Sequence, residues 1–385
     1  MSSTRSPFRR TVVAVASCLV VAATVVSSSA AAADTRKDTV QRDLDALVRV
    51  DGFPGVLAAV RGRDARVRDY TAGVGNLATK AKVPVDGQVR IGSNTKTFVA
   101  TVVLQLVGEG KIDLDVPVET YLPNLVRGEG IDGRKITVRQ LLQHTSGLPD
   151  YDGDVVQDYL TKMRHTYFEP RQLLDFGLSR PALFAPGTGW EYSNTNYVVA
   201  GLLVQKVTGR PIGEEITDRV INRIGLRHTY WPAVGDQSIH GAHPQGYFAA
   251  KPGDPLVDVT ESDPSAGWAA GAMISTPDDI LRFFTALIDG RLLAPEQLKQ
   301  MQSTVAAPGS DVRGDERYGL GLQTFSLSCG GFAWGHGGAY PGYETANAVT
   351  TDGRGAVVAV TALPTTLEAA THVEEAVDHA ICGRI

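Results

Sequence analysis

The sequence predicts an α+β protein in which an antiparallel sheet, flanked by terminal helices, carries an inserted and mainly helical lobe. Three observations lead to this class. The last third of the chain alternates apolar and polar residues with period two. Two short strand candidates lie near the N-terminus, and the region of about 93–265 has mostly helical periodicity with long polar connections. We therefore expect strands from both ends of the chain to join in one sheet.

The N-terminal elements are predicted as a helix at 39–50 and two strands at 55–60 and 67–74. Leu44, Leu47 and Val48 share one face of that helix. In the helical lobe, apolar runs predict a helix that follows Ser93 and ends at Gly108 to Gly110, and further helices at 137–144, 196–207 and 212–224. Residues 232–265 are rich in Pro, Gly and Asp and are expected to be irregular.

The C-terminal third is predicted to complete the sheet. Thr276 followed by Pro277 and two aspartates is a typical helix start. Consecutive antiparallel strands are expected at 319–327, 332–335, 345–350 and 355–362, and a final helix at about 366–381. The sheet lobe should thus comprise about 38–92 and 266–385, and the helical lobe about 93–265.

The first 33 residues are typical of a signal peptide. Arg5, Arg9 and Arg10 form a positive region, residues 12–26 an apolar stretch, and residues 30–33 a small-residue cleavage region. The apolar stretch is too short for a stable membrane anchor. The Arg9-Arg10 pair leaves twin-arginine export open. We expect a secreted, extracellular protein, with residues 34–385 as the mature domain.

Composition narrows the function classes further. Loss of three arginines with the signal peptide lowers the formal charge from −5 to −8, which argues against nucleic-acid binding. The mature chain keeps two cysteines, Cys329 and Cys382, and two cysteines in an exported protein are expected to be bridged. The eight histidines are scattered and no His-Glu-x-x-His motif occurs, so we expect no metal and no cofactor. A monomer is the expected state.

The stretch of residues 92–98 is a candidate catalytic motif. Ser93 lies at or just before a helix N-terminus, where backbone N–H groups are unpaired. Lys96 follows about one turn later, so its ammonium can lie beside the serine oxygen. A desolvated lysine can be neutral and accept the serine proton. Alone, Ser-x-x-Lys is weak, because an N-cap serine beside a solvated lysine has the same spacing.

Two further motifs accompany it, each present once. Tyr192 and Asn194 precede an apolar helix; they form either a capping loop or a pair that points into a cleft. In the functional alternative, a nearby lysine favours the anionic form of Tyr192, which shuttles protons, and the Asn194 amide holds a substrate carbonyl. His336 lies among glycines near a strand, where a ligand can approach the strand edge closely. A backbone N–H there, with that of Ser93, would form an oxyanion hole.

Together the three motifs resemble those of the penicillin-recognising serine hydrolases, in the branch of class C β-lactamases, secreted D-Ala-D-Ala carboxypeptidases and related esterases. The likeness covers nearly all of the mature chain and includes residues 141–148, which are typical of that branch and expected to be structural. It is strongest to the secreted D-Ala-D-Ala carboxypeptidase/transpeptidase, in residues 192–196 and 327–330 and in a disulfide at the spacing of Cys329 and Cys382. It implies a β-lactamase/DD-peptidase-like fold.

The resemblance also implies roles for individual residues. Ser93 would be the acylated nucleophile, with Lys96 and Tyr192 as the proton-transfer pair. Ala339 N–H would be the second oxyanion donor. The substrate-binding set would comprise Asn194, His336, Gly337, Gly338, Ala339 and Gln323. The implied partners are cell-wall peptides ending in D-Ala-D-Ala, or small esters and amides, with β-lactams as inhibitors.

Three positions depart from the carboxypeptidase pattern. Gln323 replaces an arginine, and Gly337 and Ala339 replace threonines, all of which help to hold the substrate carboxylate in that relative. Arg313 or Arg317 are candidates to take over this role. Four hypotheses follow: a D-Ala-D-Ala carboxypeptidase, which leads; an esterase or D-amino-acid amidase with the same chemistry; a β-lactamase; and a non-catalytic sensor of cell-wall peptides. The complete Ser93, Lys96 and Tyr192 set argues against the sensor.

Overall fold

The computed structural model describes residues 39–383, with the exception of 157–158, 161 and 310–313. The predicted signal peptide therefore lies outside the described residues. Among the described residues, no helix combines the length and the apolar character needed to cross a bilayer. Cys329 and Cys382 form a disulfide, as expected, and it ties the turn before β12 to the end of the last helix.

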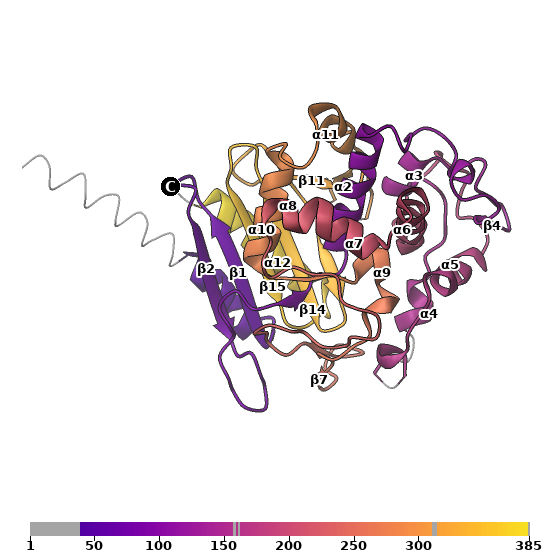
Figure 1. Ribbon diagram of the computed structural model, residues 1–385. Coiled ribbons are helices and arrows are strands. Elements are labelled where there is room, and N and C mark those ends of the chain that lie inside the picture. The colour runs from indigo at the N-terminus through magenta and orange to yellow at the C-terminus, as the bar shows by residue number, and fades with distance from the viewer. Residues whose placement is uncertain (1–38, 157–158, 161, 310–313, 384–385) are drawn as a thin grey trace, which may run out of the picture.

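One antiparallel sheet, with the strand order β2-β1-β15-β14-β12-β11-β10-β9 and β13 paired to β14, is built from both ends of the chain (Figure 1). This confirms the expected α+β class. Its strands are β1 (Gly55–Arg61), β2 (Val67–Gly73), β9 (Val305–Ala306), β10 (Arg317–Tyr318), β11 (Gln323–Ser326), β12 (Phe332–Gly335), β13 (Gly338–Tyr340), β14 (Tyr343–Val349) and β15 (Gly355–Val360). Short pairs outside this sheet join β3 (Val89–Arg90) to β8 (Ile274–Ser275), β4 (Arg127–Gly128) to β5 (Ile131–Asp132), and β6 (Tyr247–Phe248) to β7 (Val257–Asp258).

Helices cover both faces of the sheet. The helix at 39–49 and α12 (Leu367–Cys382) bury Leu44, Leu47 and Val373 against one face. On the other face, α10 (Pro277–Ile288) buries Phe283 in the large core that also holds Leu57. The central strand β15 is buried along its whole length, because it has helices on both sides. The alternation of side chains along each strand divides the apolar residues between the two cores.

The remaining helices form the lobe beside the sheet, on the side opposite β2 in Figure 1. They are α2 (Asn94–Gly108), α3 (Val138–Leu142), α4 (Asp152–Val156), α5 (Pro170–Leu178), α6 (Asn194–Thr208), α7 (Ile212–Ile216), α8 (Asn222–Ile224) and α9 (Trp268–Gly271), with α11 (Pro295–Met301) near the C-terminal end of α2. Short turns η1 (Val118–Thr120), η2 (Met163–His165), η3 (Thr217–Ile221) and η4 (Pro264–Ala266) connect them. Nearly every α2 side chain is buried, which explains its continuous apolar run.

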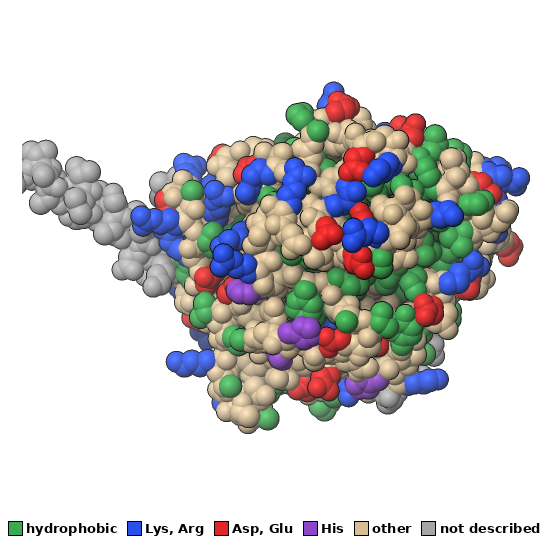
Figure 2. Space-filling view, in the orientation of Figure 1, with side chains coloured by type: hydrophobic (Ala, Val, Ile, Leu, Met, Phe, Trp, Pro, Cys, Tyr) green, Lys and Arg blue, Asp and Glu red, His purple; other side chains and the backbone are tan. Residues whose placement is uncertain are grey.

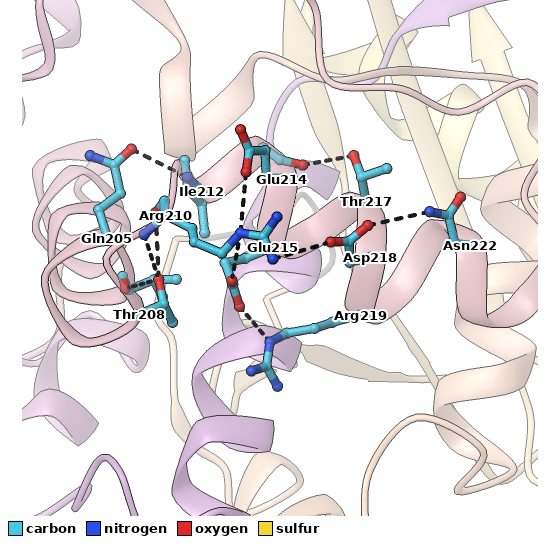
Figure 3. A network of polar contacts seen from close by, with 12 residues as sticks. Gln205, Thr208, Arg210, Ile212, Glu214, Glu215, Thr217, Asp218, Arg219 and Asn222 are labelled. Atoms are coloured by element: carbon cyan, nitrogen blue, oxygen red, sulfur yellow. Dashed lines mark hydrogen bonds and ion pairs between the residues drawn. The ribbon is translucent and has the colours of Figure 1, made fainter.

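The predicted helix at 212–224 is divided into α7, a π-helical turn η3, and α8. A network of ion pairs and hydrogen bonds fixes this segment (Figure 3). Arg219 donates to Glu215 one turn earlier and also bonds Glu109 at the end of α2. The network therefore anchors the segment at the end of α2 that is remote from Ser93. On the face shown in Figure 2, basic and acidic side chains are interspersed.

Candidate active site

Ser93 lies at the N-cap position of α2, and its side chain makes no capping bond. The N–H groups of Asn94, Thr95 and Lys96 donate to the carbonyls of Ile91, Gly92 and Ser93, so the first turn of α2 closes on itself. Lys96 is completely buried, and its Nζ lies 2.8 Å from Ser93 Oγ. This confirms the predicted serine–lysine contact.

Lys96 Nζ has two further partners, the Asn194 side-chain oxygen at 2.7 Å and the Ala270 carbonyl at 2.8 Å. Both are pure acceptors, so each takes an N–H from Lys96. The third direction faces Ser93 Oγ, which can either accept a proton from an ammonium or donate its own to a neutral amine. Burial lowers the Lys96 pKa to about 7, with Asp150 and Asp152 acting against the shift. The neutral amine therefore has its lone pair directed at the serine hydroxyl.

Tyr192 lies half-buried next to this pair, with Lys96 Nζ 4.9 Å from the centre of its ring and His144 stacked on it at 4.3 Å. The expectation of a favoured phenolate is wrong. Burial raises the Tyr192 pKa well above its usual value, and the nearby Ser93 hydroxyl acts only partly against this. Removal from water disfavours the charged phenolate, and the negative charge of Asp150 acts in the same direction. Tyr192 can thus take part only as a protonated hydroxyl that passes a proton on.

Asn194 is the first residue of α6 and not part of the preceding loop, because the helix begins two residues earlier than predicted. Its side-chain oxygen accepts from Lys96, and its NH₂ group donates to an Asp150 carboxylate oxygen at 3.0 Å. That Asn194 holds a substrate carbonyl stays a prediction. The contacts do make Asn194 the link between the buried base and a carboxylate.

Ala339 lies in β13, where the two-residue turn Pro341-Gly342 pairs Tyr340 with Tyr343 and Ala339 with Glu344. The pair that closes a two-residue hairpin is hydrogen-bonded, and the next pair is not. The Ala339 N–H and C=O therefore point away from β14. They face Gly92, because a Cβ built on Gly92 would lie 2.3 Å from the Ala339 oxygen and 2.9 Å from its nitrogen. This register supports the predicted pairing of Ala339 N–H with Ser93 N–H in an oxyanion hole.

Two other predicted binding residues, His336 after β12 and Gln323 in β11, are occupied within the protein. His336 is buried; its Nδ1 contacts the Gly337 carbonyl at 2.6 Å and its Nε2 the Tyr318 hydroxyl at 2.7 Å. Burial lowers its pKa to about 3, so the ring is neutral. Gln323 is also buried and accepts from Gly337 N–H at 3.0 Å. In this structure both side chains shape the strand that carries Ala339.

A pocket of about 300 Å³ opens above Ser93. Two aspartates line it, Asp150 and Asp152, together with Tyr192, Asn194 and Ala339. Its remaining wall is mainly apolar and includes Tyr151, Val155, Val156, Tyr159, Tyr340 and Pro341. Among the described residues that line it, none is a lysine, arginine or histidine.

The two aspartates were missed by the sequence reasoning. Asp150 lies two residues after the stretch 141–148, for which the resemblance predicts a structural role. Burial raises the pKa of Asp150, and burial together with the Asp150 charge raises that of Asp152 to about 6.

Of the arginines proposed to hold a carboxylate, Arg317 donates to the Thr304 carbonyl at 2.9 Å and is absent from the pocket wall. Arg313 lies outside the described residues.

A serine beside a buried lysine, a tyrosine hydroxyl and two convergent N–H groups define a serine hydrolase site. Comparison with known families agrees: the family model described as Beta-lactamase matches residues 40–380, and the chain belongs to this family.

Similar proteins include amide hydrolases and penicillin-binding proteins. A D-stereospecific amidohydrolase from Streptomyces sp. is 38% identical with a TM-score of 0.81, over 90% of this chain and 98% of that chain. The D-amino acid amidase from Ochrobactrum anthropi SV3, complexed with L-phenylalanine amide, is 29% identical with a TM-score of 0.76, over 90% and 97%. The putative penicillin-binding protein PbpX of Bacillus subtilis (strain 168) is 27% identical over 70% of this chain, and the match spans 60% of PbpX.

Proposed function

We propose that the protein hydrolyses amide bonds of D-amino acid derivatives that carry a free amino group, through an acyl-enzyme on Ser93. The observation that carries this proposal is the charge of the pocket beside the nucleophile. Asp150 and Asp152 line it, and no described residue of its wall is cationic. An ammonium group would find charge-assisted acceptors there, whereas a substrate carboxylate would meet like charge.

In the first half of the reaction, Ser93 Oγ attacks the substrate carbonyl carbon and its proton passes to neutral Lys96. The carbonyl oxygen becomes an oxyanion that accepts from the N–H groups of Ser93 and Ala339. The C–N bond then breaks. The leaving amine takes the proton back from Lys96, with the Tyr192 hydroxyl as relay, and Ser93 is left as an ester.

In the second half, water attacks the ester carbonyl and gives its proton to Lys96. The same two N–H groups hold the second oxyanion. Collapse returns the proton to Ser93 Oγ and releases the acid, so each turnover consumes one water. The apolar wall of the pocket would receive the side chain of the acyl residue, since it offers aromatic and valine surface next to Ser93.

The D-configuration rests on the two amide hydrolases named above, which are a D-stereospecific amidohydrolase and a D-amino acid amidase. A D-Ala-D-Ala carboxypeptidase is the second candidate, favoured by the similarity to PbpX. Against it, Gln323 and Arg317 bind within the protein and leave the described pocket wall without a cation. The signal-peptide pattern of residues 1–33 supports action outside the cell.

Three substrates test this proposal: D-phenylalanine amide, its N-acetyl derivative, and an acylated peptide ending in D-Ala-D-Ala. We expect kcat/KM to be highest for the free amine. Asp150→Asn should lower it by about 10- to 100-fold, because a charge-assisted hydrogen bond contributes about 1.5–3 kcal/mol. The variant should barely affect the N-acetyl derivative.

Asp154→Asn is the matched control, since Asp154 pairs with Arg180 and does not line the pocket. Faster turnover of the D-Ala-D-Ala peptide than of D-phenylalanine amide would overturn the amine-directed proposal and favour the carboxypeptidase. Equal losses on the free and acetylated amides would remove Asp150 from amine recognition.

The pH dependence of turnover should report Lys96. The base must be neutral, and burial places its pKa at about 7, so kcat/KM for an uncharged ester such as p-nitrophenyl acetate should fall about tenfold per pH unit below pH 7. The Asp150 charge raises this pKa, so Asp150→Asn should move the acid limb to lower pH. A profile that stays level from pH 5 to 8 would exclude Lys96 as the base.

A further inference from the structure

The two oxyanion donors come from segments far apart in the chain, and a buried set of side chains connects them. Asn94 directly follows Ser93, and Gly338 directly precedes Ala339. Between them, Asn347 Nδ2 donates to Asn94 Oδ1 at 2.7 Å, across 253 positions of sequence. Thr345 Oγ1 accepts from Asn94 Nδ2 at 2.6 Å and donates to the Gly338 carbonyl at 3.2 Å.

The hydrogen bonds of this amide network, defined here as Asn94, Thr345 and Asn347, use all its polar side-chain groups. Asn94 also donates to the Ile91 carbonyl at 2.9 Å. Asn347 donates to the His336 carbonyl at 2.6 Å and accepts from the His336 N–H at 3.3 Å. That backbone N–H can only donate, so it fixes the orientation of the Asn347 amide and, in turn, that of Asn94.

The network also replaces part of the sheet. β12 pairs with β14 at Trp334 and Val349, and β13 resumes the pairing at Gly338 and Thr345. Between these pairs, the Asn347 side chain accepts a hydrogen bond from the His336 N–H and donates one to the His336 C=O. All three network side chains are at least 96% buried, with Asn94 at 0%, Thr345 at 1% and Asn347 at 4% exposure. A buried and fully satisfied polar network is rigid.

We propose that Asn94, Thr345 and Asn347 are positioning residues that set the separation of the Ser93 and Ala339 N–H groups. They touch no substrate. They hold the segment on each side of the oxyanion hole, and the donors must lie within a few tenths of an ångström of the position that the oxyanion occupies. The proposal rests on acyl transfer at Ser93 and not on the identity of the substrate.

A matched pair of substitutions tests it. Thr345→Val removes the hydroxyl between Asn94 and Gly338 at constant shape, and Thr324→Val removes an equally sheet-bound hydroxyl that donates to the Ala333 carbonyl at 2.9 Å. We expect Thr345→Val to lower kcat for p-nitrophenyl acetate about 10-fold or more, with KM within threefold of wild type. Asn347→Ala should lower kcat by about 10²-fold, the lower end of the loss for one oxyanion donor. Thr324→Val should leave both constants unchanged.

Binding of phenylboronic acid gives a second readout, because its tetrahedral adduct on Ser93 places an oxygen in the oxyanion hole. Its affinity should fall by the same factor as kcat. The double variant Asn94→Ala/Asn347→Ala should lose no more boronate affinity than the poorer of its two single variants, because both residues belong to one network. The positioning role would be overturned if Thr324→Val lost as much kcat as Thr345→Val, or if kcat of the network variants fell while their affinity for the boronate stayed unchanged. Failure of wild type itself to bind the boronate would instead contradict the nucleophilic role of Ser93. Circular dichroism at the assay temperature restricts the comparison to folded variants.

Discussion

Replacing Ser93 with alanine is expected to abolish turnover of every substrate while the protein remains folded. No other group can form the acyl-enzyme in the proposed reaction, and loss of a catalytic nucleophile typically lowers kcat by at least about 10⁴-fold. The Ser93 hydroxyl contributes little to the fold, because Lys96 keeps its contacts to Asn194 and the Ala270 carbonyl without it. The measurements are the steady-state rate with D-phenylalanine amide, the initial burst with p-nitrophenyl acetate, and the melting temperature.

Ser193→Ala provides the control for this prediction. Ser193 is fully buried at the start of α6, one residue from Tyr192, and its hydroxyl has no hydrogen-bond partner among the described residues. We expect near-normal turnover from it. If Ser93→Ala kept more than a hundredth of wild-type activity, the acyl-enzyme mechanism would have to be abandoned, whereas a loss in both variants would point to damage of the shared surroundings.

Local signals predicted most of the fold. Period-two alternation located β12 with the bounds Phe332–Gly335 that the structure shows, and the Thr276-Pro277 start located α10, where Thr276 accepts from Asp279 N–H. By contrast, β13 was missed because its three residues, Gly338–Tyr340, are too few for a periodicity and begin with glycine. Its pairing with β14 depends on the Pro341-Gly342 turn and on packing against Gly92.

The candidate site was predictable to the extent that its residues form short motifs. Ser93 and Lys96 lie one helical turn apart, so their contact follows from helix geometry. The partners of these motifs come from distant segments. Asp150 is linked to Lys96 by hydrogen bonds through Asn194, and Asn347 donates to Asn94 from a strand far away in the sequence. One sequence contains no signal for such pairings. The same limit affected Tyr192, whose protonation state depends on burial and not on its neighbours in the chain.

Gly92→Ala should produce the second large loss, because it separates the two oxyanion donors without changing either. Gly92 has φ +47°, and its Cβ would lie 2.3 Å from the Ala339 oxygen, closer than any real contact. Either β13 or the start of α2 must move. Loss of one donor costs roughly 10²–10³ in kcat, and the left-handed backbone adds about 1–3 kcal/mol of strain to the folded state.

Gly209→Ala separates these two effects, since Gly209 also has positive φ, +73°, but nothing lies within 4 Å of its Cβ. It ends α6, so alanine there should lower the melting temperature through the left-handed backbone strain alone and leave kcat unchanged. Comparing kcat for p-nitrophenyl acetate in the two variants therefore separates the effect of displaced oxyanion donors from the effect of backbone strain. If Gly92→Ala lost no more kcat than Gly209→Ala, the contact between Gly92 and Ala339 would have no part in oxyanion stabilisation, and the second donor would have to be sought elsewhere along the pocket. A specific loss would show that the need for glycine before the nucleophile arises from the approach of β13 and not from the turn into the helix.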